Sequence, residues 1–85
     1  MTKVTDKMLE NAVNQLNIAA GMPTQAYHGN NWNIGSYYID KAYGGNKLVQ
    51  VDNNTGGVRD VLNSGYVNKR ECLELIWAYH AGHKT

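Results

Sequence analysis

Two glycine-rich turns divide the middle of the chain into three short stretches of strand-forming residues. The first turn is Gly-Gly-Asn at 44–46, and the second is Asn-Asn-Thr-Gly-Gly at 53–57. Glycine and asparagine accept the positive φ angles that tight hairpins need. The spacing therefore predicts three strands joined as an antiparallel meander, at 34–43, 47–52 and 58–62.

Side chains alternate along the expected strand at 47–52. Val49 and Val51 point one way, while Leu48 and Gln50 point the other way. Because successive side chains of a strand face opposite sides of the sheet, this pattern predicts a central strand with one core face.

Start and stop signals indicate one helix on each side of this meander. Thr5 is a helix-capping residue before an amphipathic stretch, and Gly21 is a typical stop. Asn68 with Glu71 three residues later forms a capping-box pattern, and Gly82 is expected to end that helix. The sequence thus predicts an α+β domain of order α-β-β-β-α, with a three-stranded antiparallel sheet packed against two helices.

The stretch at 22–33 lacks periodicity and contains polar residues and glycine. It is expected to be an irregular connection in which Tyr27 and Trp32 fold back as anchors. In the predicted architecture the helices cover one face of the sheet, and the other face stays available to a partner or a second copy of the chain.

Length and charge limit the classes of partner. The 85 residues are enough for one small domain, and the formal net charge of +1 creates no long-range attraction to nucleic acid or anionic membranes. No apolar run approaches the roughly 18 residues of a membrane span, and residues 1–10 are too polar for a signal peptide. Together with the single cysteine, Cys72, these features predict a cytoplasmic protein without a membrane partner.

Three short motifs carry a resemblance to a known family. They are A-Y-G-G at 42–45, G-G-V at 56–58 and K-R-E at 69–71. In this respect the chain resembles a family of small uncharacterised proteins encoded by tailed bacteriophages and prophages, over about residues 34–82. The resemblance implies a phage-related origin, and it assigns no catalytic or binding role to any residue.

Residues that could form a metal or nucleophilic site are few. His80 and His83 are spaced to share one helix face, but a stable zinc site needs about three or four protein ligands, and Cys72 is two turns away. A lone cysteine on an apolar helix face is typically a small core residue. We therefore expect neither a metal nor a cofactor.

The acidic residues of the expected strands also favour a structural interpretation. Asp40, Asp52 and Asp60 alternate with basic residues that form surface ion pairs more naturally than a catalytic carboxylate pair. The glycine pairs lack the lysine and hydroxyl residue of a phosphate-binding loop. The sequence thus predicts that the protein is not an enzyme. An enzyme becomes an alternative only if His28, His80 or Cys72 shares a cleft with a carboxylate.

Aromatic and basic side chains accompany one another on the expected sheet, and about half of the aromatic ones are needed to fill a core without phenylalanine. The remainder suits a protein interface, because tyrosine and tryptophan give large contact areas at low entropic cost. The predicted partner-binding residues are Trp32, Tyr37, Tyr38, Tyr43, Lys41, Lys47 and Arg59. Tyr66 is expected near them on the sheet.

These expectations combine into one functional hypothesis. The chain is expected to be a phage or prophage accessory protein that binds and inhibits or redirects a host macromolecule, such as a component of a defence system in the manner of an anti-CRISPR or anti-restriction protein. The alternative is an accessory factor for single-stranded nucleic acid, whose bases would stack on the same aromatic residues. A homodimer is a further alternative for the open sheet face.

Overall fold

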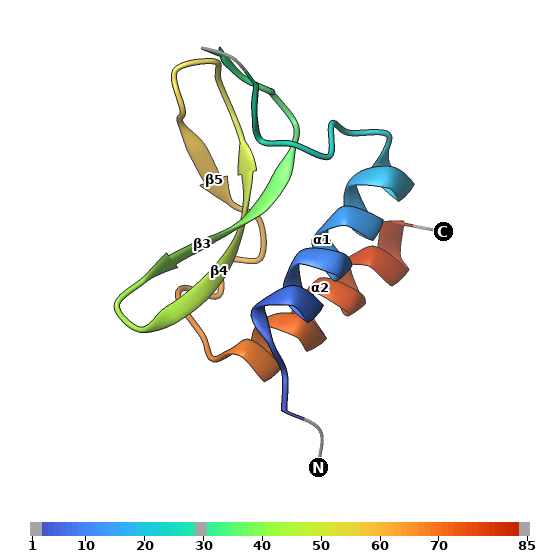
Figure 1. The fold of residues 1–85 in the computed structure, drawn as a ribbon, viewed down its shortest axis with the longest axis vertical. Helices are drawn as coiled ribbons and strands as arrows, with labels where there is room; N and C mark the ends of the chain where they lie inside the picture. Colours follow the sequence, from blue (N-terminus) through green and yellow to red (C-terminus); the bar gives the residue numbers. More distant parts are fainter. Residues whose placement is uncertain (1–2, 29–30, 84–85) are drawn as a thin grey trace.

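The computed structural model describes residues 3–28 and 31–83, apart from the side chains of His28 and His83. Two helices pack against one face of a three-stranded antiparallel sheet of order β3-β4-β5, and a two-stranded hairpin lies outside this sheet (Figure 1). The predicted α+β class and the order helix, strands, helix are confirmed. The elements are α1 (Asp6–Ala20), β1 (Tyr27–His28), β2 (Asn31–Trp32), β3 (Tyr37–Ala42), β4 (Gly45–Val51), β5 (Val58–Asp60) and α2 (Lys69–His83).

Helix α1 begins and ends where its capping residues predict. The Thr5 hydroxyl accepts a hydrogen bond from the Met8 N–H at 3.2 Å, which satisfies one of the unpaired amides of the first turn. Gly21 adopts a left-handed conformation with φ of 71°, and the Met22 N–H reaches back to the Asn17 carbonyl at 2.8 Å. Both boundaries of α1 are therefore set by local chemistry.

Helix α2 begins as predicted but ends later. The Asn68 side-chain oxygen accepts the Glu71 N–H at 2.8 Å, which forms the expected cap. The prediction that Gly82 ends the helix is wrong, because α2 continues to His83 and Gly82 has no positive φ. A glycine ends a helix only where the chain uses its left-handed conformation, and here it does not.

The hairpin between β3 and β4 uses a turn one residue earlier than predicted. Tyr43 and Gly44 are its two central residues, with φ of 54° and 73°. Ala42 therefore pairs with Gly45, and β4 begins at Gly45 rather than at residue 47.

Strand β3 also begins later, and strand β5 ends earlier, than predicted. Before β3, the Gly35 N–H and the Ser36 carbonyl both bond to Val51, so that two residues oppose one, as in a β-bulge. After β5, the Asp60 carboxylate accepts the N–H groups of Asn63 and Gly65 at 3.0 and 3.3 Å and turns the chain away from the sheet.

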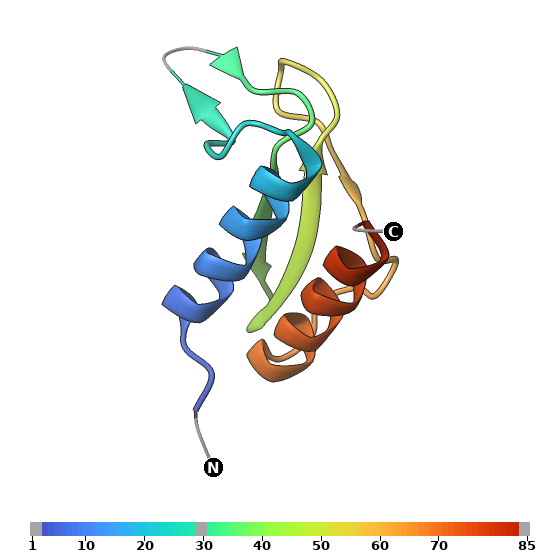
Figure 2. The same ribbon diagram turned by 90° about the vertical axis from the view of Figure 1, so that its right-hand side faces the viewer.

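The main core lies between the two helices and one face of the sheet (Figure 2), where α1 contacts β3 and α2 contacts β4. Leu48, with 1% of its surface exposed, faces this core opposite Ile39. Val49 and Val51 point to the opposite side of the sheet, which we call the far face. Because Val49 is also 0% exposed, both sides of β4 are buried, and the prediction of a single core face is wrong.

The connection after α1 is more regular than predicted. Its strands β1 and β2 form a hairpin in which Tyr27 pairs with Trp32. The two rings are in edge contact, with centroids 5.1 Å apart, so the two residues fold back together. No helix in the described part of the chain is long and apolar enough to cross a membrane.

Candidate partner-binding surface

A row of aromatic side chains follows the far face of the sheet. Its first part brings Trp32 within 5.1 Å of Tyr27 and 5.9 Å of Tyr38, measured between ring centroids. Its second part pairs Tyr43 with Tyr66 at 5.6 Å. We call these five residues the aromatic row. It extends from the β1–β2 hairpin to the β3–β4 turn, and Tyr43 at that turn is 94% exposed.

Trp32 explains why the far face of β4 is buried. Its indole contacts Tyr38 on one side and lies so close to Gly56 that a Cβ there would be 2.9 Å from Nε1. The indole thus crosses the far face between β3 and the β4–β5 turn, and Tyr38 is the direct cross-strand neighbour of Val49. The prediction of an open second face is therefore wrong for its middle part. Aromatic rings replace a helix layer there.

Tyr66 is held in place by a polar contact from β3 and a cation from β4. Its hydroxyl donates to the Asp40 carboxylate at 2.6 Å, and the Lys47 Nζ lies 4.4 Å from the ring centroid. The hydrogen bond to Asp40, followed by burial, raises the pKa of Tyr66 to about 12. Tyr66 is therefore a neutral donor at physiological pH, and its ring supports the exposed ring of Tyr43.

The predicted site residues do not all share this face. Trp32, Tyr38, Tyr43 and Lys47 lie on it or at its edge. Tyr37 does not, because it is 4% exposed within the main core and its hydroxyl is 3.1 Å from that of Tyr79. The prediction that Tyr37 contacts a partner is wrong, since strand alternation places it beneath the helices.

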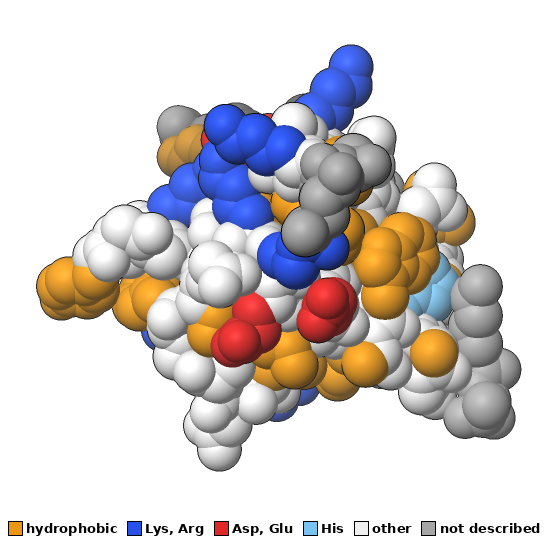
Figure 3. Space-filling model, turned by 90° about the horizontal axis from the view of Figure 1, so that it is seen from below, with side chains coloured by type: hydrophobic (Ala, Val, Ile, Leu, Met, Phe, Trp, Pro, Cys, Tyr) orange, Lys and Arg blue, Asp and Glu red, His pale blue; other side chains and the backbone are white. Residues whose placement is uncertain are grey.

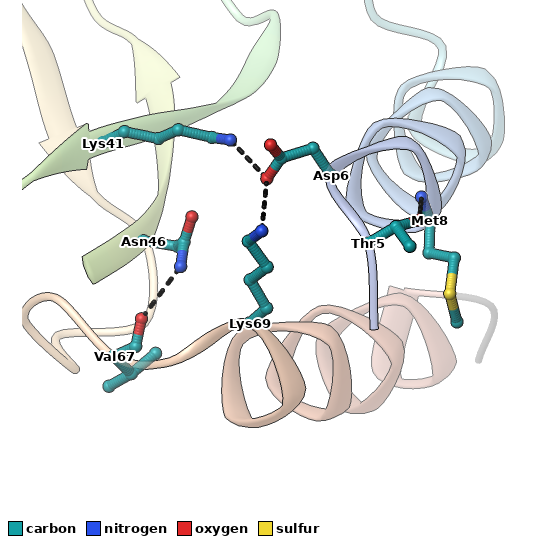
Figure 4. A network of polar contacts seen from close by, with 7 residues as sticks. All are labelled: Thr5, Asp6, Met8, Lys41, Asn46, Val67 and Lys69. Carbon is teal, nitrogen blue, oxygen red and sulfur yellow. Dashed lines mark hydrogen bonds and ion pairs between the residues drawn. The ribbon is translucent and has the colours of Figure 1, made fainter. Parts of the chain in front are cut away.

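The other two predicted cations lie on the helix side of the sheet. Lys41 forms an ion pair with Asp6 of α1, which Lys69 of α2 also approaches, at 3.4 Å (Figure 4). The hydrogen bond from Lys41 lowers the pKa of Asp6. Arg59 donates two hydrogen bonds to the Gln50 side chain at 2.8 and 3.1 Å.

Positive charge consequently does not follow the aromatic row. Figure 3 shows Lys and Arg side chains gathered over one side of the lower end of the molecule. In the aromatic row, the lysine over Tyr66 is accompanied by Asp40, and Asp60 faces the same side, opposite Val49.

The candidate catalytic groups are buried. Cys72 lies in the main core, and burial raises the pKa of its thiol to about 11, so the nucleophilic thiolate is disfavoured at neutral pH. His80 is buried and stacks on Trp77 with ring centroids 5.4 Å apart. Within the described residues, no group of three or more His, Cys, Asp and Glu could hold a metal. The side chains of His28 and His83 lie outside the described part of the chain, so predictions that involve them stay predictions.

Sequence reasoning missed the part that Asp40 plays in this surface. Asp40 and Tyr66 are 26 residues apart, and no local motif links a strand carboxylate to a tyrosine in a distant turn. Tyr27 was expected as an anchor but not as a member of an exposed surface, although half of its side chain is accessible.

The Asp40–Tyr66 bond gives a direct test of the geometry of this surface. In Asp40→Asn the charged acceptor is lost, and we expect the pKa of Tyr66 to fall from about 12 toward its ordinary value of 10.0. The Tyr66 ring signals in an NMR titration report this pKa. Asp52→Asn, which removes an exposed carboxylate beyond β4, should leave the titration unchanged. Equal effects of both substitutions would contradict the specific bond.

The raised pKa of Tyr66 makes the stability of the protein depend on pH. Because the folded state raises the pKa of Tyr66 and, chiefly through burial, that of Tyr37 to about 12, it favours their protonated forms. Their contribution is therefore complete below pH 10 and is lost as the pH rises from 10 to 12. In Asp40→Asn the contribution of Tyr66 should be smaller across this range.

Comparison of the chain with models of protein families, with curated proteins and with solved structures finds no match in any of the three.

Proposed function

We propose that this protein is a non-enzymatic binding protein whose aromatic row contacts a protein partner. The observation that carries the proposal is the exposure of aromatic side chains around a fixed centre. Tyr43 and Tyr27 project from the two ends of the row, while Trp32 and Tyr66 are held by ring contacts and by Asp40. Rings that are already ordered lose little entropy on binding, which is why such residues dominate protein interfaces.

The distribution of charge favours a protein over single-stranded nucleic acid. A nucleic-acid surface needs cations that follow the phosphates beside the stacking rings. Of the three predicted cations, only Lys47 lies beside the row, and Asp40 and Asp60 face the same side. Lys41 and Arg59 interact on the helix side instead. The row therefore combines aromatic area with mixed charge, as the rims of protein interfaces do.

The resemblance to tailed-phage and prophage proteins supports a host macromolecule as the partner. A small protein that acts by contact alone inhibits or redirects its target by covering a surface of it. We therefore propose that this chain is a phage accessory protein that acts in the host cytoplasm, and that its target is a protein of a host defence system.

A substitution at the exposed end of the row tests the proposal. Tyr43→Ala removes a side chain that contributes contact area but no core packing, so we expect partner affinity to fall by about tenfold or more while the fold persists. The partner is first captured from bacterial lysate, with and without nuclease, and identified by mass spectrometry. The purified pair is then measured by calorimetry.

Ile18→Ala is the matched control, because Ile18 is 62% exposed and lies on α1, outside the row. It should leave affinity unchanged. Capture that disappears on nuclease treatment would favour the nucleic-acid alternative, and equal losses for both variants would remove the aromatic row from the interface.

A further inference from the structure

Strand β3 lies at one edge of its sheet. Among the described residues its strand partner is β4, and the hydrogen bonds of an antiparallel ladder alternate in direction along a strand. The Leu48 carbonyl accepts from Val61, and Asn46 exchanges two hydrogen bonds with Val67, so both residues direct their backbone groups away from β3. Their partners in β3, Ile39 and Lys41, must therefore direct their N–H and C=O groups outward, away from β4.

Asn17 of α1 occupies the first outward position of this edge. Its side-chain amide accepts the Tyr37 N–H at 2.8 Å and donates to the Tyr37 carbonyl at 3.0 Å. These are the two bonds that a residue of an adjacent strand would make. At Ile39 and Lys41 no described residue supplies the equivalent bonds. Two residues, and therefore up to four backbone hydrogen bonds, remain open beside a position that is already filled.

A groove of about 230 Å³ follows this open part of the edge, between β3 and α1. Leu9, Val13 and Ile39 give it an apolar lining, and Glu10 adds a carboxylate. Thr24 and Ala26, from the connection after α1, also line the groove, as do Asp6 and Lys41. The groove thus combines a strand edge, an apolar surface and an acidic group.

The charges in the groove specify the kind of side chain that fits. Asp6 is already neutralised by Lys41 and Lys69 (Figure 4). Glu10 is exposed, and within the described part of the chain it forms no ion pair. A basic side chain on an incoming strand would find its partner in Glu10, and an acidic one would be repelled.

A second copy of the chain fits this edge poorly. A symmetric β3–β3 pairing centred on Lys41 places two lysines opposite each other, and one centred on Asp40 places two carboxylates opposite each other. The pairing centred on Ile39 sets Lys41 against Tyr37 of the other copy, whose backbone groups already bond to Asn17. Each register therefore brings like charges together or loses hydrogen bonds.

We propose that the groove between β3 and α1 binds an extended peptide segment, which adds to β3 as a fourth strand and places a basic side chain against Glu10. This mode supplies main-chain hydrogen bonds for affinity and alternate side chains for specificity. The site lies at the edge of the sheet, separate from the aromatic row, and it does not depend on the partner proposed above.

A synthetic peptide pair tests the proposal on the full chain. The basic probe is acetylated and amidated Thr-Val-Thr-Lys-Thr-Val-Thr, whose valines and lysine share one face, and the matched probe has glutamate in place of lysine. In NMR titrations we expect the Ile39 and Lys41 amides to shift and to become protected from exchange with the basic probe. We expect the acidic probe to bind about tenfold more weakly.

Two controls distinguish strand addition from non-specific binding of the peptide. N-methylation of alternate residues of the basic probe, in two versions, should abolish binding in one version and spare it in the other, because only one set of amides faces β3. Glu10→Gln should remove the preference for lysine, whereas Glu74→Gln on α2, which also removes an exposed carboxylate, should keep it.

Three outcomes would overturn the proposal. The first is the absence of saturable shifts at Ile39 and Lys41 up to about 1 mM basic probe, the weak end of specific binding. The second is equal binding by both N-methylated versions. The third is a lysine preference that survives Glu10→Gln.

Discussion

Asn17→Ala is expected to lower the free energy of unfolding by about 3 kcal/mol, because it removes the two hydrogen bonds that the Asn17 amide makes with the Tyr37 backbone in a buried site. Asn17 is 0% exposed and makes both bonds from α1 to β3. A buried backbone group that loses its partner costs about 1–3 kcal/mol, and this substitution affects two. Urea unfolding followed by circular dichroism measures the loss.

Asn14→Ala is the matched control for this prediction. Asn14 lies one turn earlier on the same helix but is exposed, so the substitution changes helix propensity in the same way without breaking the contact with β3. Its free energy of unfolding should stay within about 0.5 kcal/mol of the parent. Similar losses in the two variants would show that the Asn17 amide does not join α1 to the sheet.

Shortening a buried side chain on either face of β4 to alanine is expected to destabilise the protein. Leu48→Ala should cost about 3 kcal/mol, because it opens a cavity in the main core, and Val49→Ala should cost about 2 kcal/mol on the far face. The second value depends on the cover that Trp32 and Tyr38 provide. Chemical unfolding of the two variants gives both values.

Val58→Ala provides the comparison on the far face. Val58 points to the same side as Val49, but it lies on β5 and is partly exposed, so its truncation should cost less than about 1 kcal/mol. A strand with a single buried face, as the sequence suggested, would instead show a large cost on one side of β4 and a negligible cost on the other. That result would contradict the packing of Trp32 over the far face.

The two buried faces of β4 show what the alternation of side chains along a strand can predict and what it cannot. Period-two patterning correctly separated Leu48 from Val49 and Val51, because successive side chains of any strand point to opposite sides. It could not show which side faces the helices, since each side carries apolar residues. That assignment depends on which elements pack on each face, and Trp32 comes from a hairpin that the sequence did not predict.

The candidate surface was predicted in part for a similar reason. Aromatic and basic residues on the sheet could be identified from their strand positions, and Trp32, Tyr38, Tyr43 and Lys47 do lie on or beside the far face. Alternation places Tyr37 on the same side as Ile39 and Tyr38 on the side of Asp40, but it does not show which of these sides the helices cover. The acidic partner of Tyr66 is remote in sequence and became visible only in the folded chain.

Local sequence is sufficient for the features whose causes lie within a few residues. Thr5, Gly21 and Asn68 bound the helices through contacts no more than four or five residues away, and glycine with asparagine sets the positions of the hairpin turns to within a residue or two. The tertiary structure alone decided the contacts between distant elements. These are the bonds of Asn17 to Tyr37, the cover of Trp32 over β4, and the open edge of β3 beside α1. Such contacts arise when the faces of separate elements meet. Because the side chains involved are of common types, no local sequence pattern predicts which of them will pair.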